Sequence, residues 1–238
     1  MLVKEWMSTT VITVDPGTSI AEAIQLLNRH HISILPVMQG EKLVGVVTDT
    51  DLRAFGSSLA PAGETPLWGA LVLERIRVED VMSRAPITIP LDFTVEEAAD
   101  VLFKNTVPGV AVVDEGNRIV GVMTQTDINR VMVSVTGLWR GGIAFGFLIE
   151  DSPGSIKSVT DILRAYGGRL ASILTAYERA PKGFRRVHIR VRGLDRSRLT
   201  QMTEELHDQA MLLYMVDHRL NTREFFGEMR QSSATVQK

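Results

Sequence analysis

The sequence contains one unit twice, and this internal repeat limits the possible folds more than any other feature. A Met-Ser pair at Met7 is followed, in order, by segments at residues 12–14, 19–27, 35–38 and 43–52. The same order returns after the Met-Ser pair at Met82, with segments at residues 87–89, 94–102, 110–113 and 119–128. The period of about 75 residues is longer than a solenoid repeat, so we expect a duplicated domain whose copies form a pseudo-twofold pair.

Each copy has the pattern of a helix followed by a β-hairpin. Ser19 and Thr94 have hydroxyls suited to an N-cap, and the residues after them are apolar at helical spacing. Two short, β-branched runs then flank a turn that contains Gly40 in the first copy and Gly116 in the second. We expect hairpins at residues 34–38 with 43–47, and at 110–113 with 119–123.

The second hairpin strand of each copy ends in Gly-x-x-Thr-x-Thr-Asp, which begins at Gly45 and again at Gly121. An aspartate here can accept two hydrogen bonds from a ribose diol, and threonine hydroxyls at a helix start can donate to a phosphate. The glycine leaves room for close approach. Thr and Asp are also good N-caps whether or not a ligand binds. Because the motif occurs twice at equivalent places, we favour the ligand interpretation over the capping one.

Composition excludes several classes of protein. The 238 residues are 45% hydrophobic and include no cysteine, which rules out disulfides, thiolate metal sites and a cysteine nucleophile. No apolar run approaches the roughly 20 residues of a membrane helix, and the N-terminus lacks a secretory signal, so we expect a cytoplasmic protein. Residues 1–142 carry 11 Lys and Arg against 17 Asp and Glu, which argues against nucleic-acid binding.

The pattern changes after a glycine-rich hinge at residues 137–142. Strands are expected at residues 143–149, 170–177, 186–191 and 211–216, and helices after Ser152-Pro153 and at 197–207. This β-α-β-β-α-β order is ferredoxin-like. The basic residues at 179–192 are interpreted as solvated charge near a hairpin.

Residues 3–135 resemble a tandem pair of CBS domains in the Met-Ser start, the helix, the Pro36-Val37 strand and both Gly-x-x-Thr-x-Thr-Asp endings. The resemblance implies two β-α-β-β-α units that form a disc with two clefts for an adenine nucleotide, AMP, ADP, ATP or a related adenosine compound. By resemblance, the ribose and phosphate positions are Thr48, Thr50, Asp51, Thr124, Thr126 and Asp127. The adenine positions are Thr13, Ile32, Ser33 and Ile34, and again Thr88, Val107, Pro108 and Gly109.

The two copies differ at the adenine positions. Pro108-Gly109 replaces Ser33-Ile34, and proline lacks the backbone donor that would hydrogen-bond adenine. The first cleft is therefore the stronger prediction. His30 and His31 are interpreted as surface histidines at a helix end rather than as phosphate ligands.

Residues 143–218 resemble an ACT domain, through the ferredoxin-like order and the turn at residues 150–156. The resemblance implies an amino-acid effector site, at a dimer interface, formed by Asp151, Ser152, Pro153, Gly154, Ser155 and Ile156. Free N–H groups at a helix start suit a carboxylate. The alternatives stay open: this turn only starts a helix, and many ACT domains only pair subunits.

We thus expect a mixed α/β (α+β) chain with CBS domains at residues 3–55 and 77–135, a linker at 56–76, an ACT domain at 143–218 and a C-terminal tail at 219–238. The combination resembles the acetoin-utilisation regulatory proteins. The sequence contains no Gly-x-Ser-x-Gly nucleophile motif, no glycine-rich phosphate-binding loop and no histidines at the spacing of zinc ligands. We expect no metal and no catalytic cofactor. The leading hypothesis is a non-catalytic nucleotide sensor, a homodimer with an unidentified regulated protein. The alternative is a ligand-free interaction module for an enzyme or transporter.

Overall fold

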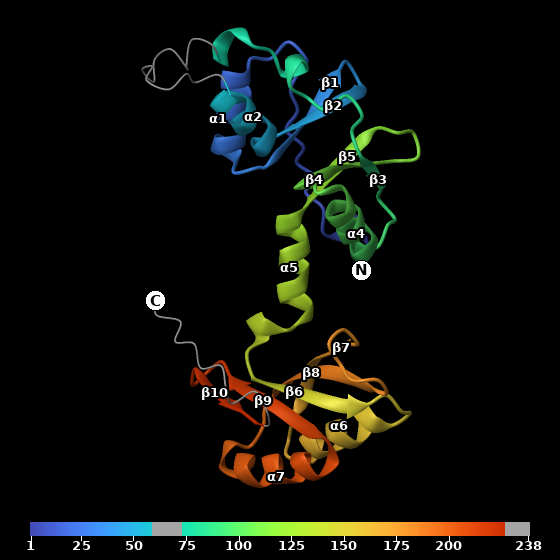
Figure 1. Cartoon of the computed structure of the whole chain (residues 1–238), viewed down its shortest axis with the longest axis vertical. Helices are drawn as coiled ribbons and strands as arrows, with labels where there is room; N and C mark the ends of the chain where they lie inside the picture. Colours follow the sequence, from blue (N-terminus) through green and yellow to red (C-terminus); the bar gives the residue numbers. More distant parts are fainter. Residues whose placement is uncertain (59–72, 227–238) are drawn as a thin grey trace. The chain divides into compact units, whose positions relative to one another are not determined.

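The computed structural model describes residues 1–58 and 73–226, and the chain divides into two compact units, Met1–Val131 and Met132–Lys238. Figure 1 shows the elements of each unit. Most of the linker expected at 56–76, and the end of the tail expected at 219–238, lie outside the described residues. No described helix has both the length and the apolar character needed to cross a membrane.

The first copy of the repeat begins with a capped helix. Helix α1 (Ile20–His30) starts where the Ser19 hydroxyl accepts a hydrogen bond from the Glu22 N–H at 3.2 Å. It ends at His31, whose backbone is left-handed, with φ of 52°. Strands β1 (Ile34–Gln39) and β2 (Lys42–Thr48) form the expected antiparallel hairpin, and α2 (Asp49–Ser58) follows.

The second copy repeats this order and contains one additional strand. Strand β3 (Thr88–Pro90) pairs in parallel with β4 (Gly109–Val113), whereas the first copy has only a single bridge, from Val14 to Val37, at the same place. Helix α4 (Val95–Asn105) has a reciprocal capping box at Thr94. Strand β5 (Ile119–Thr124) leads into α5 (Gln125–Val135). The β-α-β-β-α pattern of the duplicated unit is therefore confirmed in the second copy and reduced in the first.

The Met-Ser pair of each copy packs on the last strand of the other copy. Ser8 bridges Val122 with two hydrogen bonds of 3.0 Å, and Ser83 bridges Val46 in the same way. A Cβ added to Gly121 would lie 2.5 Å from the sulfur of Met7, and one on Gly45 would lie 2.7 Å from that of Met82. The expectation that these glycines make room for a ligand is wrong, because the space is filled by the Met-Ser segment.

The second unit is a five-stranded antiparallel sheet with both helices on one face. Its elements are β6 (Ile143–Glu150), α6 (Ser155–Ala165), β7 (Arg169–Ala176), β8 (Phe184–Arg192), α7 (Leu199–Gln209), β9 (Met211–Asp217) and β10 (Thr222–Phe225). The spatial order is β10-β9-β6-β8-β7. The expected β-α-β-β-α-β order is confirmed, and β10 adds a strand within the segment expected to be a tail.

Successive side chains along each strand point to opposite faces of the sheet, and this alternation explains the layers of the unit. Phe145, Phe147 and Ile189 point to the face covered by α6 and α7, where they pack with Leu163 and Met202. Figure 1 shows both helices on that side of the sheet. The opposite face carries the polar residues of β8, which include His188 and Arg190.

Helix α6 begins two residues later than expected. Its N-cap is Gly154, with φ of 89°, and Ser152-Pro153 form a turn before it. The Ser155 hydroxyl and N–H both donate to the Ser152 carbonyl, at 2.9 and 3.3 Å, which closes this turn. The chain therefore needs the glycine, which adopts positive φ without strain, before the helix can start.

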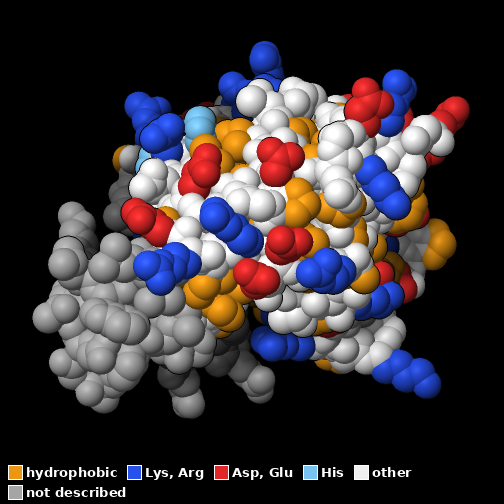
Figure 2. Space-filling view, turned by 90° about the horizontal axis from the view of Figure 1, so that it is seen from above, with side chains coloured by type: hydrophobic (Ala, Val, Ile, Leu, Met, Phe, Trp, Pro, Cys, Tyr) orange, Lys and Arg blue, Asp and Glu red, His pale blue; other side chains and the backbone are white. Residues whose placement is uncertain are grey.

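Charge on the surface is mixed. Figure 2 shows acidic and basic side chains interspersed on the face of the described residues that it presents. This pattern is typical of a solvated surface rather than of a phosphate-backbone binding face.

Candidate functional site

The aspartates of the two Thr-x-Thr-Asp corners are first of all helix caps. Asp51 Oδ2 accepts hydrogen bonds from the Thr48 N–H at 2.9 Å and the Thr48 hydroxyl at 2.7 Å, and the Asp51 N–H donates back to that hydroxyl at 3.2 Å. Asp127 and Thr124 form the same three bonds, at 2.9, 2.7 and 3.3 Å. The capping interpretation is therefore correct for one oxygen of each carboxylate.

This geometry changes what each residue can offer a ligand. The hydroxyl protons of Thr48 and Thr124 are already donated to Oδ2, so these two threonines do not donate to a phosphate in this arrangement. The Oδ1 atoms of Asp51 and Asp127 take no part in the cap. A ribose diol would therefore have to bind at Oδ1, which in Asp127 already accepts a hydrogen bond from Arg130. Within residues 1–58 and 73–226 the hydroxyls of Thr50 and Thr126 form no hydrogen bond, so they are available to a phosphate.

A cavity of about 550 Å³ opens beside Asp127. It contains the second copy's Thr124, Thr126 and Asp127 together with Ile32, Ser33 and Ile34 of the first copy. Residues that the sequence did not indicate complete its wall: Met7, Ser8, Thr9, Thr10, Ile12, His31, Val122 and Arg130. The cavity thus combines apolar surface suited to a base with hydroxyls and two basic groups suited to a sugar phosphate.

Residues of both copies therefore form the wall of this cleft. The structure places Ser33 of the first copy in one cavity with Asp127 of the second, and the Ser33 carbonyl also accepts a hydrogen bond from the Asp49 N–H at 3.2 Å. The cause is the crossed Met-Ser segment, which pairs Ser8 with Val122 and brings the first copy onto β5. His31, interpreted as a surface residue, is part of this wall.

Arg130 supplies a positive charge to the wall of the cleft. Its guanidinium donates to Asp127 Oδ1 at 2.6 Å and to the Trp6 carbonyl at 3.1 Å. Asp127 is 8% exposed, so this ion pair is partly shielded from water. Arg130 lies three residues after Asp127, on the same face of α5, and that helical spacing is a signal that the sequence did contain.

The remaining predicted positions do not line the cleft beside Asp127. Asp51 lies in a separate cavity of about 330 Å³ with Phe55 and Asp80. Thr13 is exposed and lies outside the large cleft, whereas Thr88 lies on β3. Val107, Pro108 and Gly109 line neither cavity, and a Cβ on Gly109 would touch Ile34 at 3.2 Å. The cleft beside Asp127 is the one with the first copy's Ser33-Ile34.

The turn at residues 151–156 forms one compact group in the second unit. Arg185 of β8 lies 3.4 Å from Asp151 Oδ1 and donates to the Ser155 hydroxyl at 3.1 Å. No side chain caps the start of α6 at Gly154, and Arg185 Nε is buried without a partner. The N–H groups at this helix start are thus accompanied by a guanidinium. Among the described residues, no group of three His, Asp or Glu side chains is placed to hold a metal.

Comparison with known proteins places this arrangement in a family. The family profile described as CBS domain matches residues 3–57 and 78–134. A CBS domain-containing protein of Dictyostelium discoideum is 32% identical over 137 residues, which are 57% of this chain and 93% of that protein. An L-aspartate semialdehyde sulfurtransferase of Methanocaldococcus jannaschii is 34% identical over 131 residues, 55% of this chain. The match spans only 23% of the sulfurtransferase's length.

Solved structures also resemble part of the chain. A CBS domain pair in complex with 5′-methylthioadenosine and S-adenosyl-L-methionine is 33% identical, with a TM-score of 0.46, over 56% of this chain and 95% of the other. The structure of CBSX2 in complex with AMP is 26% identical, with a TM-score of 0.45, over 56% of this chain and 96% of the other. Both alignments cover little more than half of the chain.

Proposed function

The chain belongs to the CBS domain family, and from this premise we propose that it is a non-catalytic regulatory sensor whose first unit binds an adenine nucleotide. The observation that carries the proposal is the cavity of about 550 Å³, in which apolar residues, free hydroxyls and Arg130 meet around Asp127. Adenine packs against Ile32, Ile34 and Val122 in this proposal. The phosphates lie toward Arg130 and His31.

The two capping aspartates provide a matched test. Replacement by alanine removes the same helix cap in each case, at a cost of about 1 kcal/mol, but only Asp127 faces the large cleft. We expect AMP, ATP or S-adenosylmethionine to bind the full chain in calorimetry, Asp127→Ala to lose binding, and Asp51→Ala to retain it. Equal losses in both variants, or no binding by the wild type at millimolar ligand, would contradict the proposal.

A second part of the proposal concerns the second unit. We place an amino-acid effector, through its carboxylate, at the start of α6, as expected of an ACT domain. The support is the uncapped helix start beside Arg185, a guanidinium that can pair with a carboxylate. A melting screen of the full chain with amino acids tests it. An amino acid that raises the melting temperature of wild type but not of Arg185→Gln supports this site.

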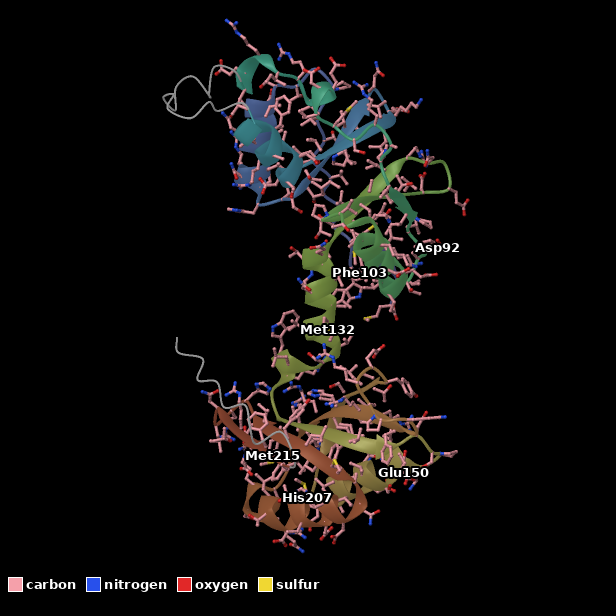
Figure 3. The ribbon with its side chains drawn as sticks, viewed as in Figure 1. Asp92, Phe103, Met132, Glu150, His207 and Met215 are labelled. Atoms are coloured by element: carbon pink, nitrogen blue, oxygen red, sulfur yellow. The ribbon has the colours of Figure 1, made fainter. Side chains whose placement is uncertain are left out.

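We also propose that the chain signals as a homodimer to a separate regulated protein. Phe103 on α4 is 83% exposed, and it borders a shallow hollow of about 210 Å³ with Ala99, Leu102 and Ile128. Figure 3 labels Phe103 beside α4. An apolar surface of this kind also fits the alternative function, a ligand-free interaction module. A dimer observed by sedimentation, together with no binding of nucleotide by that dimer, would favour that alternative.

A further inference from the structure

Four arginines line one small cavity in the second unit. The cavity has a volume of about 230 Å³, and none of the nine residues that line it is Asp or Glu. Its arginines are Arg140, Arg192, Arg196 and Arg219. Convergence of like charges is unfavourable, so the feature needs a physical reason.

The arginines come from four separate segments, so no single run of sequence produces the cluster. Arg140 ends a short 3-10 helix at Leu138–Arg140, Arg192 ends β8, Arg196 begins another 3-10 helix, and Arg219 follows β9. Gly142 lets the first segment approach β8, because a Cβ there would lie 2.2 Å from the Val191 carbonyl oxygen. The fold thus holds the four side chains around one hollow.

Among the described residues, one carboxylate forms an ion pair with one of these four arginines, and it does not neutralise their combined charge. Asp217, 3% exposed, forms an ion pair with Arg196, and its Oδ1 also accepts hydrogen bonds from the Arg219 N–H at 2.9 Å and the Leu220 N–H at 3.3 Å. Its carboxylate therefore compensates one guanidinium. Within residues 1–58 and 73–226, the guanidinium groups of Arg140, Arg192 and Arg219 form no ion pair and no hydrogen bond.

A further arginine, Arg190, is buried on β8 two residues before Arg192. Arg190 is 3% exposed, and its Nη1 atom is buried with no hydrogen-bond partner. Its Nε donates to the Thr136 carbonyl at 2.8 Å, and Nη2 lies 3.4 Å from His218 Nε2. Burial lowers the pKa of Arg190, as expected for a cation without a carboxylate partner. Burial and then Arg190 likewise lower the pKa of His218.

We propose that this cavity binds a phosphate-bearing anion with at least two negative charges, at a site separate from the nucleotide cleft of the first unit. Guanidinium groups form paired hydrogen bonds to phosphate oxygens, and three unpaired ones supply the charge to balance a pyrophosphate group. The volume limits the ligand to a small phosphate ester or to the phosphate portion of a larger molecule.

Calorimetry of the full chain with inorganic pyrophosphate tests the proposal. We expect binding that weakens as salt rises, and at least a tenfold loss of affinity in the double variant Arg192→Gln/Arg219→Gln. Both side chains are exposed, so the variant should fold, which circular dichroism checks. Lys157→Gln/Arg164→Gln removes the same two positive charges from α6, outside the cavity, and should bind as the wild type does.

Further control measurements distinguish binding at this cavity from binding elsewhere on the protein. Asp127→Ala should leave pyrophosphate binding unchanged, because the nucleotide cleft lies in the first unit. Loss of pyrophosphate binding in Asp127→Ala but not in the double arginine variant would overturn the proposal. So would the absence of pyrophosphate binding by the wild type at millimolar concentration, or a preference for citrate, which would indicate a carboxylate site.

Discussion

Two residues of identical type and identical capping role, Asp51 and Asp127, differ in their surroundings. Three positions after Asp127 stands Arg130, whereas Ala54 stands three after Asp51. The pair Asp127–Arg130 borders the large cleft, and Asp51 lies in a smaller cavity that also contains Asp80. At the scale of single residues, the duplicated unit is therefore chemically asymmetric, and a phosphate is favoured beside the arginine rather than beside two carboxylates.

The role proposed for Arg130 gives a direct prediction. Arg130→Gln removes the positive charge from the cleft and leaves Asp127 Oδ1 without its partner. Because hydrogen bonds to charged groups contribute about 1.5–3 kcal/mol, we expect AMP or ATP to bind at least tenfold more weakly. The measurement is calorimetric titration.

Arg53→Gln is the matched control. Arg53 also follows an aspartate on a helix and pairs with Asp49 at 2.7 Å, but its side chain is 72% exposed and lies outside the cleft. It should leave the affinity unchanged. Similar losses of nucleotide affinity in both variants would mean that the net charge of the protein, rather than the position of Arg130, determines binding.

At the scale of elements, the crossed Met-Ser segments decide how the copies join. Each segment adds to the edge of the other copy's last strand, and Gly45 and Gly121 permit the contact. The same crossing brings Ser8 into the wall of the cleft. Pairing of the copies and formation of the cleft therefore depend on one set of backbone contacts.

Gly121→Ala tests this dependence. Its added methyl would lie 2.5 Å from the Met7 sulfur and 2.9 Å from the Ser8 carbonyl oxygen, so the segment must shift. We expect a loss of about 1–3 kcal/mol of stability in urea denaturation, with weaker nucleotide binding. Gly17→Ala is the control, because nothing lies within 4 Å of its added Cβ and its φ is not positive. An equal loss in both variants would contradict the steric explanation.

His188, on the sheet face opposite the helices of the second unit, predicts a pH dependence of stability. Burial, then Arg190 and His218, lower the pKa of His188, whose Nδ1 lies 3.0 Å from the Tyr214 hydroxyl. The unfolded chain then binds the proton at higher pH than the folded one does. The free energy of unfolding should therefore fall as pH drops through about 6.5 and level off below the folded-state pKa.

Urea denaturation of the full chain between pH 8 and pH 5 measures this effect. His188→Asn keeps a polar atom near Tyr214 and should show a smaller decrease than the wild type. His30→Asn, at the exposed end of α1, should follow the wild-type curve. An unchanged slope in His188→Asn would show that His188 does not contribute.

At the scale of the whole molecule, the chain has two units with separate cores and separate candidate ligand sites. Hydrogen exchange of the full chain measures ligand binding at both candidate sites in one experiment. Since a ligand stabilises the folded state to which it binds, AMP should protect residues 7–12, 31–34 and 122–130, and pyrophosphate should protect 140–143 and 191–196. Protection of the same segments by both ligands would contradict the assignment of two distinct sites.

The sequence by itself determined the local structure and the family. The repeat, the N-cap hydroxyls at Ser19 and Thr94 and the alternating apolar strands each depend on neighbours a few residues away, so periodicity reveals them. The β-α-β-β-α-β order of the second unit was predictable for the same reason. The start of α6 was missed because the positive φ of Gly154 follows from the turn that precedes the helix.

Only the tertiary structure decided which residues meet. Ser33 lies with Asp127 because a bridge between Ser8 and Val122 crosses the copies, and no local pattern encodes a contact between residues so far apart in the chain. The four arginines of the second unit likewise come from segments joined only by the sheet. Helices and hairpins follow from short-range spacing, whereas clefts depend on long-range packing, and that packing made the two copies of one motif unequal.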